Sequence, residues 1–127
     1  MKVLLDTRAL LWWLGGDRRL GAEARGIIES RDNQILLSVV SLWEIVVKTR
    51  VGKLRVDLDE VTREATAGGL IRLDIQQAHL TALAGLPLHH GDPFDHLLVA
   101  QAIAEDADFM TADRLVGHYA VRTLPCR

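Results

Sequence analysis

Residues 92–113 read DPFDHLLVAQAIAEDADFMTAD and carry the clearest structural signals in the chain. An aspartate followed by a proline is typical of a helix N-cap and first helical position, and the apolar pattern predicts a helix over Pro93–Glu105. The apolar run that follows predicts a short strand at Asp108–Met110, with Asp113 just beyond it. Helix and strand therefore follow one another directly in this part of the chain.

The same alternation extends in both directions. Short apolar runs predict further strands at Lys2–Leu5, Ile35–Val39, Ile71–Leu73 and Val121–Leu124. Helical spacing and end signals predict helices over Thr7–Leu14, Gly21–Ser30, Ser41–Arg50, Asp57–Ala67, Gln76–Ala84 and Arg114–His118. Strands separated by helices predict an α/β fold, a parallel sheet of about five strands with helices on both faces. We expect residues 1–127 to form one domain.

Composition narrows the class of protein. The chain has 127 residues, of which 49% are apolar and 25% charged, enough to bury a core. Its longest apolar run, Ala9–Leu14, is too short to cross a membrane, and no signal peptide is visible. Cys126 is the only cysteine, which excludes an internal disulfide and Cys₄ zinc sites. We therefore expect a cytoplasmic protein with no membrane association.

Four acidic residues fall where a parallel sheet would bring them together. Asp6 ends the first strand, Glu44 lies in the helix after the second, Asp95 opens the 93–105 helix, and Asp113 follows the strand at 108–110. Ligands of open parallel sheets bind at the carboxyl ends of the strands. Carboxylates gathered there would hold Mg²⁺ or Mn²⁺, and such an ion activates water and offsets phosphodiester charge.

Each acid also has a purely structural interpretation. Ser41 and Glu44 match a capping box, and Glu44 can pair with Lys48 one helical turn later. Asp6 and Asp113 are suited to be N-caps, as is Asp92 before Pro93. Four caps need not lie on one edge of a sheet, however, so the joint pattern favours a metal site.

Several segments resemble PIN-domain ribonucleases, specifically the VapC-type toxins of type II toxin–antitoxin pairs. The similar segments are MKVLLDTRALLWWL at the start, SVVSLWEIVVKTRVGKL, DPFDHLLVAQAIAEDADFMTAD and the closing VRTL. The resemblance implies an α/β/α sandwich, Mg²⁺-dependent endoribonuclease activity with Mn²⁺ as a substitute, and inhibition by a VapB-like antitoxin. By motif it assigns Asp6, Glu44, Asp95 and Asp113 as the catalytic, metal-binding acids. Arg8 departs from the histidine that often follows DT in similar sequences.

Other features carry weaker predictions. Lys48, Arg50, Lys53 and Arg55 form a basic run suited either to RNA phosphates or to a solvated helix end. The five histidines lack metal-ligand spacing, and His89 and His90 are expected to be exposed in a loop. The helix at 7–14 is apolar nearly all round, so part of it is expected either to meet a partner, in a homodimer or with the antitoxin, or to be covered by later helices.

Two other functions fit parts of the sequence. A phosphoryl-transfer or phosphatase domain also places an aspartate at the end of a strand, but Arg8 stands where an aspartyl-phosphate enzyme needs its second aspartate. A non-catalytic binding module would keep the acids only as caps. No glycine-rich phosphate loop or G-x-S-x-G motif is present.

Overall fold

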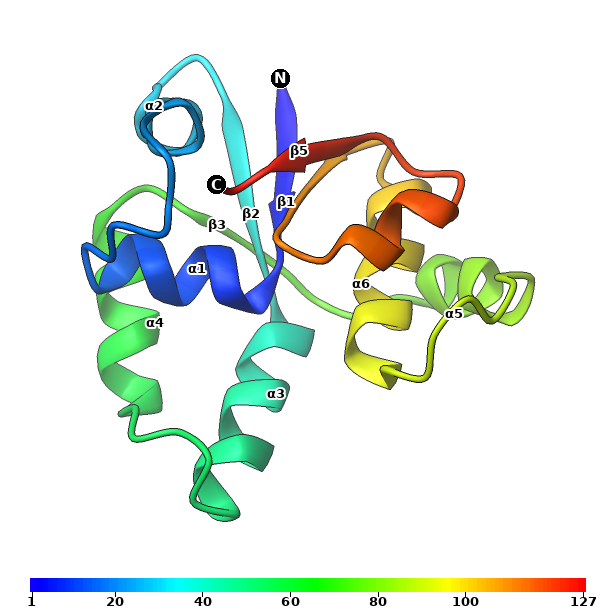
Figure 1. Ribbon diagram of the computed structural model, residues 1–127, viewed down its shortest axis with the longest axis horizontal. Helices are drawn as coiled ribbons and strands as arrows, with labels where there is room; N and C mark the ends of the chain where they lie inside the picture. The colour runs from blue at the N-terminus through cyan, green and yellow to red at the C-terminus, as the bar shows by residue number, and fades with distance from the viewer.

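The computed structural model describes residues 1–127 and contains one sheet flanked by helices (Figure 1). The strands are β1 (Lys2–Leu5), β2 (Gln34–Ser38), β3 (Ile71–Leu73), β4 (Asp108–Thr111) and β5 (Thr123–Pro125). The helices are α1 (Thr7–Leu14), α2 (Ala22–Glu29), α3 (Val39–Arg50), α4 (Leu58–Ala67), α5 (Gln77–Ala84), α6 (Pro93–Ala104) and the 3₁₀ helix η1 (Arg114–His118). No helix is long and apolar enough to span a membrane.

The five strands form a parallel sheet in the order β3-β2-β1-β4-β5. Leu4 at the centre of β1 pairs with Leu36 of β2 on one side and with Phe109 of β4 on the other. The predicted α/β class, with about five parallel strands, is therefore confirmed. Because all strands run the same way, the segments after β1, β2 and β4 begin at one edge of the sheet.

Helices cover both faces of the sheet, as predicted. In Figure 1, α1, α2 and α4 lie on one side of the strands, and α5 and α6 lie on the other. Alternate residues of β1 point to opposite faces. Val3 and Leu5 join the core under the first group of helices, whereas Leu4 joins the core under α6.

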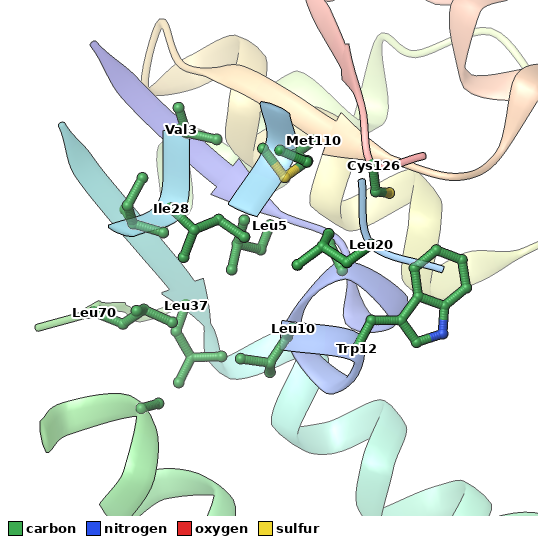
Figure 2. Close-up of a cluster of buried hydrophobic side chains, with 14 of the residues drawn as sticks. Val3, Leu5, Leu10, Trp12, Leu20, Ile28, Leu37, Leu70, Met110 and Cys126 are labelled. Atoms are coloured by element: carbon green, nitrogen blue, oxygen red, sulfur yellow. The ribbon is translucent and has the colours of Figure 1, made fainter. Parts of the chain in front are cut away.

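The larger core cluster explains the apolar character of α1. Leu10 and Trp12 of α1 are buried in one cluster with Leu5 of β1 and Leu37 of β2 (Figure 2). Leu11, Trp13 and Leu14 are partly buried and pack against the same cluster. Neighbouring helices therefore cover much of the surface that the sequence left open to a partner.

The observed boundaries differ from the predicted ones mainly at helix starts. Helix α3 begins at Val39, not at Ser41, because the Ser38 side chain accepts a hydrogen bond from the Val40 amide and caps the helix there. The capping box expected from Ser41 and Glu44 is therefore wrong, and both residues lie within the helix. The last strand is shifted to Thr123–Pro125 from the expected 121–124.

Candidate metal centre

A cavity of about 370 Å³ opens at the carboxyl edge of the sheet. Its lining contains all four acids singled out from the sequence, together with one further aspartate, two cations and three uncharged residues: Asp6, Glu44, Asp95, Asp113, Asp92, Arg8, Lys48, Thr7, Leu11 and Leu54. Five carboxylates thus face two cationic groups. Parallel strands and the helices that follow them have brought together residues more than one hundred positions apart.

Asp6 is the most deeply placed of these acids, with 4% of its surface exposed. One carboxylate oxygen, Oδ1, accepts a 2.6 Å hydrogen bond from the Ala9 amide and so caps α1. The other oxygen, Oδ2, accepts a 3.1 Å bond from the Ala112 amide beyond β4. Burial raises the pKa of Asp6, and the hydrogen bonds from Ala9 and Ala112 oppose that rise.

Glu44 reaches the cavity from the second turn of α3 and is 5% exposed. Thr7 donates a 2.6 Å hydrogen bond from its hydroxyl to Glu44 Oε1. Lys48 Nζ lies 2.5 Å from Glu44 Oε2, which confirms the pairing expected one helical turn apart. Both carboxylate oxygens are therefore held in place by side chains from α1 and α3.

Asp95 lies in the first turn of α6, next to the cavity. The Asp92 carboxylate caps this helix by accepting hydrogen bonds from the amides of Phe94 (2.9 Å) and Asp95 (3.2 Å). Burial, followed by the nearby charges of Asp92, Asp113 and Asp6, raises the pKa of Asp95 to about 8. The Asp95 carboxylate is thus a partly buried acid with acidic neighbours and without a Lys or Arg partner.

Asp113 begins η1, as a cap. Its Oδ1 accepts a 2.9 Å hydrogen bond from the Leu115 amide, and its own amide donates a 3.0 Å bond to the Thr111 hydroxyl. The structural interpretation of Asp113 as an N-cap is therefore confirmed, and it is compatible with metal binding, which stays a prediction. One oxygen serves the cap, and the other, Oδ2, faces the site.

The sequence did not indicate that a histidine belongs to this group. His90 was expected to be exposed, yet only 8% of its side chain is accessible, because the ring packs against His96 and Tyr119 and lies beside two acids. Its Nε2 atom lies 3.6 Å from Asp95 Oδ2 and 3.7 Å from Asp113 Oδ2. Ligand atoms of these three residues all lie within 4.8 Å of one another. No spacing rule relates a loop histidine to acids that follow two different elements.

The donor set suits a divalent cation. Carboxylate oxygens are ligands of Mg²⁺ and Mn²⁺, and a carboxylate whose pKa is raised by other acids gains most from a bound positive charge. His90 Nε2 is the one buried side-chain nitrogen or oxygen atom that lacks a hydrogen-bond partner. Asp95, Asp113 and His90 could hold the ion, while Asp6 and Glu44 are each anchored by hydrogen bonds at the cavity wall.

The two cations beside the acids come from different helices. Arg8 of α1 is exposed at the cavity, and Lys48 of α3 is half-buried beside Glu44. The remainder of the predicted basic run is also exposed: Arg50 is the last residue of α3, and Lys53 and Arg55 lie in the segment after it. A cavity with an acidic floor and cations at its margin can position an anionic group next to a bound metal ion.

Comparison with solved structures finds the same fold elsewhere. The chain is similar to VapBC2 from Rickettsia felis, in a structure bound to a DNA fragment from its promoter, with a TM-score of 0.79 and 15% identity over the whole of both chains. It is also similar to VapBC-1 from nontypeable Haemophilus influenzae, with a TM-score of 0.66 and 12% identity over 98% of each chain. Curated protein sequences include no match.

The family model of the PIN domain matches residues 3–121, which include all four acids and nearly the whole sheet. At 15% identity and below, the solved structures establish likeness of fold. The family model, by contrast, matches the sequence of this chain directly, from the second residue of β1 to the segment before β5. The chain belongs to the PIN domain family.

Proposed function

We propose that this protein is a metal-dependent endoribonuclease and acts as the toxin of a cytoplasmic VapC-type toxin–antitoxin pair. One observation carries the proposal. One cavity is lined by all four predicted acids, namely Asp6, Glu44, Asp95 and Asp113. Three of them follow different strands, and Asp95 opens a helix elsewhere in the chain. Membership of the PIN domain family supports nuclease chemistry.

The hydrogen bonds around each acid suggest a different role for it. Asp95 and Asp113 would hold Mg²⁺ or Mn²⁺, because their Oδ2 atoms face the site and neither accepts a hydrogen bond from a backbone amide. Bound there, the ion would supply activation of water and charge neutralisation at the phosphodiester. Glu44, fixed by Thr7 and Lys48, and Asp6, fixed by two amides, would complete the negative wall that orients water and metal ligands.

RNA would approach from the side where the cations lie. Arg8 is exposed and has no ion-pair partner, so its guanidinium is available for a phosphate oxygen. Hydrolysis would form a bond from water oxygen to phosphorus and break the bond from phosphorus to one ribose oxygen, which takes up a proton. The arginine would hold the phosphodiester while that exchange occurs.

A VapB-like antitoxin and a second copy of the chain are the proposed protein partners. The similar solved structures are VapBC complexes, which supports the first. A groove of about 300 Å³ between α1 and α4 is a suitable place for an amphipathic antitoxin segment, because apolar residues such as Leu11 and Leu14 line it together with charged ones such as Arg55 and Glu60. Light scattering of the purified protein should give about twice the 14.1 kDa chain mass, and a mass of one chain would contradict the dimer.

The experiment that tests the activity uses total cellular RNA, including tRNA, incubated with the protein in Mg²⁺, in Mn²⁺ and in EDTA. D95N purified identically serves as the control for contaminating nuclease. We expect discrete cleavage products with either metal, none in EDTA, and none from D95N. Mapping the cut ends would then identify the target.

Absence of cleavage by antitoxin-free, correctly folded protein would overturn the proposal. That result would favour a PIN-like binding module that keeps the acids as caps. Release of phosphate from small phosphate esters, without cleavage of RNA, would instead favour a phosphatase.

A further inference from the structure

One buried polar side-chain atom in this protein, His90 Nε2, has no hydrogen-bond partner. The imidazole is about nine-tenths buried, and Nε2 has no hydrogen-bond partner, whereas every other buried side-chain nitrogen or oxygen has one. A buried polar group without a partner is energetically unfavourable, and a ligand bound to this atom would remove that cost. Its distances to the Asp95 and Asp113 carboxylates, 3.6 and 3.7 Å, are too long for hydrogen bonds.

The other side of the ring is firmly held. His90 Nδ1 lies 3.0 Å from His96 Nε2 and 3.2 Å from the Tyr119 hydroxyl. His96 Nε2 also lies 2.5 Å from the His90 carbonyl oxygen, which can only accept, so His96 Nε2 carries a hydrogen and cannot accept one from His90.

If His90 carries its hydrogen on Nδ1, the Tyr119 hydroxyl oxygen is the neighbour that can accept it. The same oxygen also accepts a 3.1 Å hydrogen bond from the His89 amide. A hydrogen on Nδ1 leaves the Nε2 lone pair directed at the two carboxylates. Metal-binding histidines are oriented in this way, with the non-ligating ring nitrogen donating to a neighbour.

The spacing also fits a shared cation. Ligand atoms that each lie ~2.1 Å from one ion are ~3.0–4.2 Å apart, depending on the angle between them. The separations of His90 Nε2 from Asp95 Oδ2 and Asp113 Oδ2 fall inside that range. A direct hydrogen bond between His90 and either carboxylate would need a shorter distance, and a bridging water between them would need a longer one.

We infer that His90 Nε2 is a ligand of the divalent cation bound by Asp95 and Asp113, an inference that rests on the proposed metal-dependent function. The site is then a mixed nitrogen and oxygen site instead of a purely carboxylate one. An imidazole ligand adds little affinity for Mg²⁺ and more for later divalent metals. The site therefore prefers Mn²⁺ or Co²⁺ to Mg²⁺.

Electron spin-echo spectroscopy of Mn²⁺ bound to the intact protein tests this directly, because it detects a coordinated imidazole nitrogen without any measurement of activity. We expect nitrogen modulation in the wild type, retained in H89Q and lost in H90Q. The adjacent His89 is exposed, which makes H89Q the matched control. Titration should show about a 10–100-fold loss of Mn²⁺ affinity in H90Q, a smaller loss for Mg²⁺, and little change in H89Q.

Two results would overturn the inference: Mn²⁺ bound to the wild type without nitrogen modulation, or modulation that persists in H90Q. In the first case the acidic metal site survives and only the histidine ligand is lost. If the wild type binds no Mn²⁺ at all, the proposed metal dependence fails as well. The wild-type spectrum, with and without ¹⁵N-labelled histidine, decides the question even if H90Q does not fold.

Discussion

Asp95 shows how a single residue can serve as part of a helix start and of a candidate site. Its amide donates to the Asp92 cap, while its carboxylate, 17% exposed, faces Asp113 and His90. The raised pKa has burial as its main cause and neighbouring carboxylates as its second. The position therefore costs stability in the absence of a cation and gains it on metal binding.

D95N should consequently stabilise the metal-free protein. At pH 8 in EDTA we expect the variant to be more stable than the wild type by about 1–2 kcal/mol, since water screens part of the repulsion at this partly exposed side chain. Mn²⁺ should raise the melting temperature of the wild type and leave D95N unchanged. Thermal unfolding checks both, with D32N, an exposed loop acid, as control. A less stable D95N in EDTA would show that the carboxylate already has a partner.

Glu105 gives a pH prediction away from the site. The buried His79 accepts a hydrogen bond at Nδ1 from the Gln76 amide, so its Nε2 donates to Glu105 at 2.9 Å. That bond, followed by the contact with Lys2, lowers the pKa of Glu105. A lowered folded pKa adds stability above the ordinary value near 4.5, and this stability is lost as pH falls through the lower folded value.

E105Q should therefore be less stable than the wild type by about 1 kcal/mol at pH 7. The difference should shrink as the pH falls from 5 to 3. Urea unfolding at several pH values measures it, and E29Q, an exposed acid at the end of α2, provides the reference. A difference that is the same at every pH would mean that the charge of Glu105 contributes nothing.

At the scale of elements, the sequence predicted every strand and helix but placed some ends wrongly. The spacing of apolar residues and the turn residues are local signals, so β1, α1 and β3 have the predicted bounds. The start of α3 depends on Ser38, whose hydroxyl also bonds Gln101 of α6, a contact between elements that no local pattern contains. The same limit applies to the site. Three of the four acids follow predicted strands and Asp95 opens a predicted helix, whereas His90 enters the site only because its loop packs on Tyr119 of a distant segment.

The junction of α1 and α4 offers a test of the packing. Gly68, the C-cap of α4, lies against the outer edge of the Trp13 indole, which a methyl group at this glycine would overlap. We expect G68A to destabilise the protein by about 1–3 kcal/mol. G26A, in the exposed middle of α2 with open space around it, should be neutral or stabilising by up to about 1 kcal/mol. Equal effects in denaturant unfolding would contradict the contact with Trp13.

At the scale of the whole molecule, the negative charge of the protein opposes binding of the proposed RNA substrate until a cation is bound. The chain has 15 Lys and Arg against 17 Asp and Glu, a net charge of −2. Five of the acids face the one cavity to which RNA would bring its phosphates. A divalent cation offsets that repulsion locally, and Arg8 and Lys48 add to its effect.

RNA binding should therefore depend on a divalent cation. With Ca²⁺, which binds carboxylates, we expect single-stranded RNA to bind at least about tenfold more tightly than in EDTA. D95N should show little of this dependence, and D32N should retain it. Fluorescence anisotropy with labelled RNA measures the affinities. Equal affinity of the wild type in Ca²⁺ and EDTA would mean that RNA binds away from the acidic cavity.

We propose that the carboxyl edge of the sheet binds a divalent cation among Asp6 after β1, Glu44 of α3, Asp95 of α6 and Asp113 after β4. Crystals soaked in Mn²⁺ and measured for anomalous scattering test this most directly. We expect one strong peak in the cavity, within about 2.5 Å of oxygen atoms of both Asp95 and Asp113. A well-ordered cavity without a peak at saturating Mn²⁺, or a peak bound only elsewhere, would contradict it.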